Sequence, residues 1–247
     1  KRLRALRCGI CQPRLVCQPE LAHPSEIKMD GEDRYREARE AMVRDQIERR
    51  KIRDPRLLEV FRRVPRHWFV PPALRDRAYD DGPLPLDEGS TISQPYIVAA
   101  MTFMLQLEGS ETVLEVGTGS GYQAAILSQL ARTVHTIERN PRLAQRAARL
   151  LAALRFDNVF VHQGDGTLGW PDGAPYQAIL VTAGAPKIPK PLIDQLDENG
   201  RLVIPVGGPR EQNLERWRKS GGRIYREHFF PVAFVPLLGE FGWKEEE

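Results

Sequence analysis

No cysteine follows position 17 in this chain of 247 residues, and the three present, Cys8, Cys11 and Cys17, all lie near its start. Three thiols cannot pair completely within one chain, so we expect no disulfide framework and a reducing, cytoplasmic location. Long apolar runs are also missing. The longest, such as residues 178–181, are short, whereas a helix that spans a bilayer needs about 18 to 20 apolar residues. The sequence therefore predicts no membrane partner.

The first 30 residues also lack the apolar stretch of about 7 to 15 residues that defines a secretory signal. They contain three prolines and no sustained helical or strand period. We therefore predict a flexible tail over residues 1–30 and a single folded domain over residues 31–247. The three cysteines and His23 include only one pair with metal-ligand spacing. We predict no metal, and a zinc site in the tail is the alternative.

Positive charge is concentrated in the first third of the chain, although the net charge is only +3. Residues 1–79 hold 20 basic and 12 acidic side chains, whereas residues 80–247 hold 16 and 21. Such an asymmetry is found in proteins that bind anions. Basic and acidic residues alternate through residues 34–49, however. This pattern favours a solvated helix face with i,i+4 ion pairs.

Helical spacing and prolines organise residues 31–108, which we predict to form a helical cap and a substrate segment. Apolar residues recur at helical spacing from residue 34 to about 50, and a second helix is expected over residues 55–63. Residues 64–72 and 79–89 are expected to be irregular. A third helix then starts at Pro95, with Ser93 or Gln94 as its cap, and runs to about residue 107.

Strand and helix patterns alternate over residues 109–247, the predicted α/β core. Alternation of this kind implies a doubly wound, mostly parallel sheet. Residues 214–238 predict strands joined at Ser220-Gly221-Gly222 with no intervening helix, which implies an antiparallel hairpin at one sheet edge. Strands are expected at residues 112–116, 133–137, 159–162, 178–182 and 202–206, and helices at about 122–130, 141–154 and 191–196.

A glycine-rich loop, Gly117-Thr118-Gly119-Ser120-Gly121, joins the first strand of this core to its first helix. It is expected at the carboxyl end of the strands, where open α/β sheets bind nucleotides. A dinucleotide-binding loop would carry its third glycine one residue later, where Tyr122 stands. The loop is therefore predicted to bind a nucleoside ligand other than NAD.

Acidic side chains lie at the ends of three predicted strands. Glu138 lies 21 residues after Gly117, where a carboxylate can accept hydrogen bonds from both ribose hydroxyls. Asp165 can accept from the exocyclic amine of adenine, and Glu115 can bind the ammonium of a methionine moiety. These features predict an S-adenosylmethionine site. The predicted cofactor-binding residues are Glu115, Gly117, Thr118, Gly119, Gly121, Glu138, Asp165 and Gly166.

The segment after the fourth strand bears on the methyl acceptor. Amine methylation commonly uses an Asn or Asp side-chain carbonyl there, but residues 182–186 read Thr-Ala-Gly-Ala-Pro. Amine acceptors are therefore disfavoured.

Several motifs occur together: VPRHWFVP at residues 64–71, TISQPY at 91–96, VLEVGTGSGY at 113–122, GDG at 164–166 and PVG at 205–207. On these motifs, about residues 33–240 resemble the protein-L-isoaspartate O-methyltransferase family. The resemblance implies a Rossmann-like class I methyltransferase sheet. The sequence departs at Ser90, where bacterial members usually have glutamine, and at Gly184, where a small alanine run is commoner.

The resemblance implies an enzyme that methylates the free α-carboxyl of L-isoaspartyl and D-aspartyl residues in damaged proteins. S-adenosyl-L-methionine would be the donor, S-adenosyl-L-homocysteine the product, and collapse of the ester to a succinimide the start of repair. The family's active-site serine falls on Ser93, in a substrate segment with Thr91 and Ile92. A carboxylate with a pKa of about 4 is already ionised at neutral pH, so orientation and exclusion of water suffice.

Two other functions stay open at this stage. An RNA methyltransferase could use the basic N-terminal helices to hold phosphates, and a protein-interaction module could retain the fold. Isoaspartate repair is preferred. We therefore expect damaged proteins and peptides as partners, no nucleic acid, and a monomer.

Overall fold

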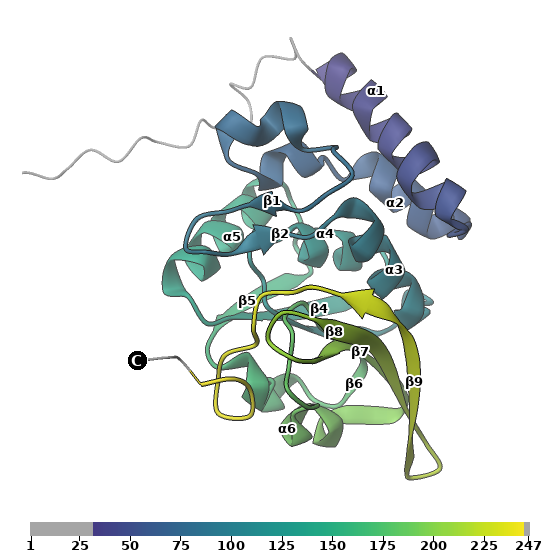
Figure 1. The fold of residues 1–247 in the computed structure, drawn as a ribbon, viewed down its shortest axis with the longest axis vertical. Helices are drawn as coiled ribbons and strands as arrows, with labels where there is room; N and C mark the ends of the chain where they lie inside the picture. Colours follow the sequence, from purple (N-terminus) through teal and green to yellow (C-terminus); the bar gives the residue numbers. More distant parts are fainter. Residues whose placement is uncertain (1–31, 245–247) are drawn as a thin grey trace, which may run out of the picture.

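In a computed structural model, residues 32–244 are described, and they form a seven-stranded sheet with helices on both faces (Figure 1). The strand order is β5-β4-β3-β6-β7-β8-β9. The predicted tail, with its cysteines, lies outside the described residues. The strands are β3 (Thr112–Val116), β4 (Thr133–Glu138), β5 (Val159–Gln163), β6 (Tyr176–Val181), β7 (Leu196–Gly207), β8 (Gln212–Ser220) and β9 (Arg223–Val232).

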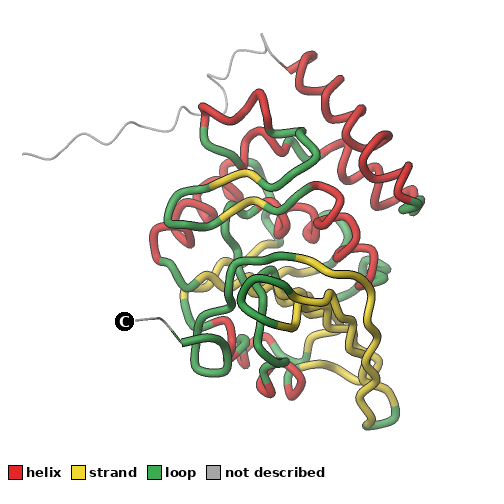
Figure 2. Tube along the Cα trace, in the orientation of Figure 1, coloured by secondary structure: helices red, strands yellow, loops and turns green. Residues whose placement is uncertain are grey.

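The pairing of these strands confirms the predicted topology. In this spatial order, the neighbouring strands β5, β4, β3, β6 and β7 pair in parallel. The pairs β7–β8 and β8–β9 are antiparallel. The β8–β9 hairpin turns at the predicted glycines and projects beyond the helices (Figure 2). Strand β7 starts at Leu196, earlier than predicted, because Leu196 pairs with Tyr176 before an irregularity in the register.

The helices bury apolar side chains on both faces of the sheet. Met101 and Leu127 pack with Val113 on one face, whereas Leu192 packs with Leu114 on the other. This arrangement confirms the doubly wound fold. The α-helices are α1 (Glu32–Met42), α2 (Pro55–Arg63), α3 (Pro95–Leu105), α4 (Tyr122–Ser128), α5 (Pro141–Ala153) and α6 (Lys190–Asp194). Shorter turns are η2 (Val43–Ile47), η3 (Glu48–Arg50), η4 (Arg66–Phe69), η5 (Pro72–Arg77), η6 (Gly166–Leu168) and η7 (Pro171–Gly173).

The N-terminal cap is helical as predicted, but its first helix is not continuous. The chain passes from α1 into the π-helical turn η2 and then the 3-10 turn η3. A π turn is wider than an α turn, and here Val43 and Ile47 are both fully buried. The expected ion pairs are present on the cap surface, among them Arg49 with Asp45.

A small antiparallel hairpin, β1 (Leu84–Pro85) and β2 (Thr91–Ile92), precedes α3. The prediction of an irregular segment over residues 79–89 missed its first strand. The predicted side-chain cap of α3 is also wrong. Gln94 occupies the N-cap position, but its amide nitrogen donates to the Asp81 carboxylate at 2.7 Å instead of capping the helix.

Among residues 32–244, strand β9 pairs with β8 alone, so its other edge has no strand partner there. Arg226 and Glu227 lie along this strand, and Pro231 lies near its end. Within residues 32–244, no helix combines the length and apolar character needed to cross a membrane.

Candidate active site

The loop between β3 and α4 is held by backbone hydrogen bonds to β4. The amides of Gly117 and Thr118 donate to the Ile137 carbonyl at 2.9 and 3.3 Å. Gly117 and Gly119 have φ angles of +97° and +52°, which disfavour any residue with a side chain. A Cβ at Gly117 would overlap the Thr182 hydroxyl, whereas Gly119 faces open space. The backbone at Gly119 is therefore accessible to a ligand.

This loop forms one wall of a pocket, and the residues around β2 form another. The pocket is narrow, with a cavity volume of about 40 Å³. It brings together the predicted substrate residues Thr91, Ile92 and Ser93 and the first part of the predicted cofactor loop. Its lining residues are Thr91, Ile92, Ser93, Val98, Met101, Gly117, Thr118, Gly119, Ser120, Tyr122, Gln123 and Thr182.

Ser93 lies between β2 and α3, directly before the N-cap of the helix. Its side chain is half-buried, and its hydroxyl has no hydrogen-bond partner in the part of the chain that the structure describes. No side chain caps α3, so the N–H groups of its first turn retain their capacity to donate. A free hydroxyl and a helix N-terminus together favour an anion at this wall of the pocket.

Glu115 lies on β3 and is fully buried. The Thr136 hydroxyl donates to one of its carboxylate oxygens at 2.5 Å, and the other oxygen has no partner. Burial raises the pKa of Glu115 to about 8, and the nearby charge of Glu138 acts in the same direction. Thr136 also hydrogen-bonds, at 2.7 Å, to Thr118, which lines the pocket. The unpartnered oxygen can accept a hydrogen bond from a cationic donor, and a cation close to Glu115 would lower this pKa and favour the charged carboxylate.

Glu138 lies at the end of β4 and is mostly buried. One carboxylate oxygen accepts from the Gly119 amide at 2.9 Å, and the other accepts from the Asn140 amide at 2.9 Å. Each oxygen can accept a second hydrogen bond. Glu138 therefore holds the glycine loop in place and still has acceptor capacity for hydroxyl donors.

Asp165 follows β5 and holds the 3-10 turn η6. Its carboxylate accepts from the amide and hydroxyl of Thr167 at 2.9 and 2.7 Å, and from the Glu240 amide at 2.7 Å. Partial burial acts to raise the pKa of Asp165, but these hydrogen bonds outweigh it and hold the pKa below its ordinary value. Gly166 packs closely, because a Cβ there would overlap Val116.

The structure divides the predicted site residues into two groups. Six of them line the pocket, whereas Glu115, Gly121, Glu138, Asp165 and Gly166 do not. Sequence reasoning missed several lining residues, and part of the signal was available. Thr182 directly follows β6, which neighbours β3, and the carboxyl ends of parallel strands form such sites. The missed lining residues are Val98, Met101, Ser120, Tyr122, Gln123 and Thr182.

Gly184, one of the two sequence departures, lies against a buried glutamine. A Cβ on Gly184 would approach the Gln212 side-chain carbon Cδ to 2.7 Å. Gln212 cannot easily move, because its amide nitrogen donates to the Gly208 carbonyl at 2.6 Å and its oxygen accepts from the Phe234 amide at 2.8 Å. Glycine at position 184 is therefore matched to glutamine at position 212 in this chain.

A mostly parallel sheet with an antiparallel edge hairpin, and a glycine loop beside acidic strand ends, define a Rossmann-like methyltransferase that uses S-adenosylmethionine. The buried, unpartnered oxygen of Glu115 and the open backbone at Gly119 fit this cofactor. The sequence model of the family Protein-L-isoaspartate(D-aspartate) O-methyltransferase (PCMT) matches residues 37–242. The chain belongs to this family.

Relatives in sequence and structure agree with this membership. The chain is 53% identical over 210 residues to protein-L-isoaspartate O-methyltransferase 1 of Syntrophobacter fumaroxidans, covering 85% of this chain and 98% of the relative. It is also 53% identical over 215 residues to the Methanoculleus marisnigri protein-L-isoaspartate O-methyltransferase, covering 87% and 97%.

A solved protein-L-isoaspartate O-methyltransferase superposes with a TM-score of 0.74 at 27% identity, covering 84% of this chain and 67% of that one. A Plasmodium falciparum structure, described as a beta-aspartate methyltransferase (PCMT) in complex with S-adenosyl-L-homocysteine, has a TM-score of 0.72 at 24% identity. It covers 81% of this chain and 98% of its own, and it shows that the fold is shared.

Proposed function

We propose that this chain transfers a methyl group from S-adenosylmethionine to the free α-carboxyl of L-isoaspartyl and D-aspartyl residues in damaged proteins, which initiates repair through a succinimide. The observation that carries this proposal is the pocket in which Ser93 faces the glycine loop. Membership of the PCMT family over residues 37–242 supports the same activity.

Cofactor binding is assigned to the glycine loop and the acidic strand ends. When bound, S-adenosylmethionine supplies an electrophilic methyl group on a sulfonium. Gly117 and Gly119 leave room for close approach to the backbone, Glu138 accepts from ribose hydroxyls, and Asp165 accepts from the adenine amine. Glu115 provides a negative charge below the loop for the methionine ammonium. The full set is Glu115, Gly117, Thr118, Gly119, Gly121, Glu138, Asp165 and Gly166.

Substrate binding is assigned to Thr91, Ile92 and Ser93. The isoaspartyl carboxylate needs no general base, because it is ionised at neutral pH. Ser93 is the proposed catalytic residue. Its hydroxyl donates to one carboxylate oxygen, and the other oxygen is then directed at the methyl group. The N–H groups at the start of α3 stabilise the same negative charge.

Residues 31–247 are proposed to act as a single methyltransferase domain, in which residues 31–108 form the cap and substrate segment and residues 109–247 hold the cofactor. A cytoplasmic monomer acting on damaged proteins and peptides is the form that we propose. The alternative of an RNA methyltransferase receives no support from the comparisons. Several arginines of the cap are paired with acidic neighbours, among them Arg49 and Arg62.

The test uses labelled S-adenosylmethionine and two peptides that differ only in an aspartyl or an isoaspartyl linkage. Base-labile label on the isoaspartyl peptide alone is expected. Label on neither peptide, while the cofactor binds, would overturn the proposed substrate. Label on an RNA added in parallel would favour the alternative activity.

Ser93→Ala tests the proposed catalytic residue, and Ser110→Ala, at an exposed position, is its matched control. A hydrogen bond to a charged group contributes about 1.5 to 3 kcal/mol, so turnover should fall about 10- to 100-fold. The affinity for S-adenosyl-L-homocysteine, measured by calorimetry, should change less than about two-fold, because Ser93 orients the substrate. Equal losses of turnover and cofactor affinity would show that Ser93 acts on the cofactor site.

A further inference from the structure

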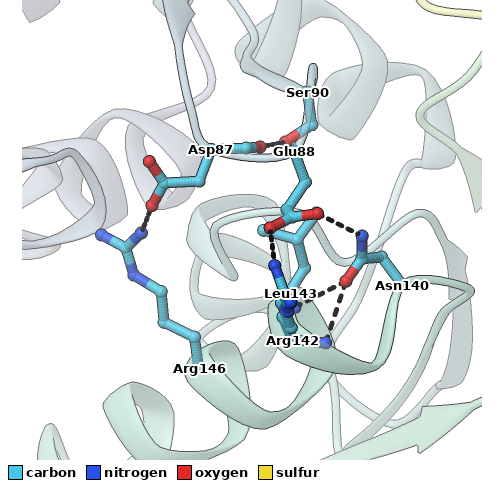
Figure 3. Close-up of polar contacts among 7 residues, drawn as sticks. All are labelled: Asp87, Glu88, Ser90, Asn140, Arg142, Leu143 and Arg146. Atoms are coloured by element: carbon cyan, nitrogen blue, oxygen red, sulfur yellow. Dashed lines mark hydrogen bonds and ion pairs between the residues drawn. The ribbon is translucent and has the colours of Figure 1, made fainter. Parts of the chain in front are cut away.

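The turn between β1 and β2 lies against the N-terminus of α5 (Figure 3). The Asp87 carboxylate contacts the Arg146 guanidinium at 2.5 Å. Glu88 contacts Arg142 at 3.0 Å and accepts from the Asn140 amide nitrogen at 3.2 Å. These three contacts, which we call the clamp, join two segments about 50 positions apart in the sequence.

The clamp contacts residues that are already held in place on both sides. Asn140 caps α5, because its side-chain oxygen accepts from the Arg142 and Leu143 amides. Its side-chain nitrogen therefore points to the turn. On the other side, the Ser90 hydroxyl donates to the Asp87 carbonyl at 3.1 Å. Serine at position 90, the second sequence departure, thus closes the turn that presents the two carboxylates.

The contacts of Glu88 also help to hold an unfavourable backbone conformation in the turn. Glu88 has a φ of +60°, a left-handed conformation that is unfavourable for a residue with a long side chain. Its contacts with Arg142 and Asn140 hold the pKa of Glu88 below its ordinary value, so the carboxylate is charged at neutral pH. The charged form is the one that the clamp requires.

The position of the clamp connects the two halves of the proposed site. On one side, Asn140 lies two residues after Glu138, which holds the glycine loop. On the other side, the turn leads directly into β2 and the pocket-lining residues up to Ser93. The substrate segment, residues 91–93, is therefore tied across the pocket to the cofactor side of the molecule.

The two ends of this segment are held with different strength. Beyond Ser93, Gln94 donates to Asp81, which also pairs with Arg50, and these two charged side chains are 37% and 38% exposed. At the clamp, Arg142 and Glu88 are 82% and 31% exposed, and Arg146 and Asp87 are 41% and 66% exposed. Exposed ion pairs are weak and are screened by salt. Because each clamp pair has one more exposed partner, we expect the clamp to open more readily than the pair at Asp81.

We propose that Asp87 and Glu88 are positioning residues that close the substrate segment over bound cofactor and set the rate at which S-adenosyl-L-homocysteine leaves. Asn140, Arg142 and Arg146 are their partners. The identity of the ligand rests on the proposed function, whereas the clamp rests on the contacts above.

The test measures dissociation of S-adenosyl-L-homocysteine from the full-length protein by stopped-flow displacement. The double variant Asp87→Asn, Glu88→Gln should release the product about 3- to 10-fold faster, as expected for loss of several weak contacts. Raising the salt concentration should speed release from the unmodified protein towards this value and should barely affect the variant. Asp194→Asn, which breaks an exposed pair with Lys190 on α6, is the matched control and should release at the unmodified rate.

Charge reversal separates an ion pair from general damage to the turn. Glu88→Arg alone should speed release, and adding Arg142→Glu should restore the slow, salt-sensitive rate. Unchanged release in the double variant, or no rescue by the reversal, would overturn the inference. Failure of the proposed function gives a different result, namely slow product release with no methylation of the isoaspartyl peptide.

Discussion

At the scale of single residues, Glu115 is the side chain with the most unusual environment in the site. Its carboxyl group is fully buried, one oxygen has no partner, and its pKa is raised to about 8. The group therefore holds a proton at neutral pH when no cation lies nearby. Its neutral isostere, glutamine, should be tolerated by the folded chain.

We predict that Glu115→Gln removes a pH dependence of stability. Below pH 4.5 the carboxyl group is protonated in both the folded and unfolded states, so its burial has little cost. Between 4.5 and about 8 the unfolded chain ionises first, and the free energy of unfolding falls. The loss is at most about 1.4 kcal/mol per pH unit. Urea unfolding from pH 5 to 8 without ligand should show this slope only in the unmodified protein, and parallel curves would contradict the prediction.

Much of the site was predictable at this scale, because the residues concerned directly follow strands. Gly117, which lines the pocket, was predicted from its place after a strand. Glu138 and Asp165 were predicted from strand ends and spacing but do not line the pocket, and their contacts with the cofactor stay predictions. Val98 and Met101 were not identified, because they line the pocket only through the way α3 packs against the loop. The contact of the Asp165 carboxylate with the Glu240 amide could not be predicted either, because 75 residues separate the two.

At the scale of elements, the junction of β6 and β7 with the C-terminal segment depends on Gly184. Its amide donates to the Val235 carbonyl, and its carbonyl accepts from the Leu237 amide and the Trp243 indole. Gln212 fills the space beside it.

We predict that Gly184→Ala destabilises the protein by about 1 to 3 kcal/mol, the usual cost of overpacking a filled site. Gln212→Ala should also destabilise it, since the Phe234 amide and Gly208 carbonyl lose a partner. The two changes should not be additive, because the shorter side chain leaves room for the new methyl group. Denaturant midpoints of the two single variants and the double variant measure this coupling. Additive losses of unfolding free energy would show that the side chains at positions 184 and 212 do not interact.

Elements with a strong periodic pattern were predicted within a few residues, as α5 and β4 illustrate. The failures have a common cause. The two-residue strands of the β1–β2 hairpin and the π turn η2 are stabilised by burial of Leu84, Ile92, Val43 and Ile47 against other elements. The local sequence propensity of a segment does not predict its contacts with distant elements.

At the scale of the whole molecule, the C-terminal segment after β9 contacts the residues that follow the carboxyl ends of β5 and β6. The Glu240 amide donates to Asp165, the Phe241 amide to Thr167 and the Trp243 indole to Gly184. The proposed adenine side of the site is thus completed by residues far along the chain.

We predict that deleting residues 239–247 weakens binding of S-adenosyl-L-homocysteine at least about 10-fold, because one hydrogen bond to the Asp165 carboxylate is worth about 1.5 to 3 kcal/mol. Glu240→Ala is the control, since it retains the backbone amide that makes the contact. Thermal melts with and without the ligand measure the effect, because at a fixed ligand concentration a ligand that binds more tightly stabilises the folded state more and raises the melting temperature further. An equal ligand-induced shift in both proteins would contradict the prediction.

The mostly parallel, doubly wound sheet and its antiparallel edge hairpin followed from alternation of patterns and were predictable at this scale, whereas the strand order was not predicted. The contacts of the β1–β2 turn with α5, and of the C-terminal segment with Asp165 and Gly184, were not predictable, because each joins distant parts of the chain.

The open edge of β9 has a consequence for an enzyme whose proposed substrates are damaged, partly unfolded chains. Such chains expose extended segments, and an unpaired strand edge is a template on which they can aggregate. Arg226 and Glu227 lie on this edge strand and pair with Glu215 and Arg216 of β8, and Pro231 lacks a backbone donor. Charged residues and a proline on an edge strand disfavour strand addition, so we expect β9 to be a poor template for the aggregation of such chains.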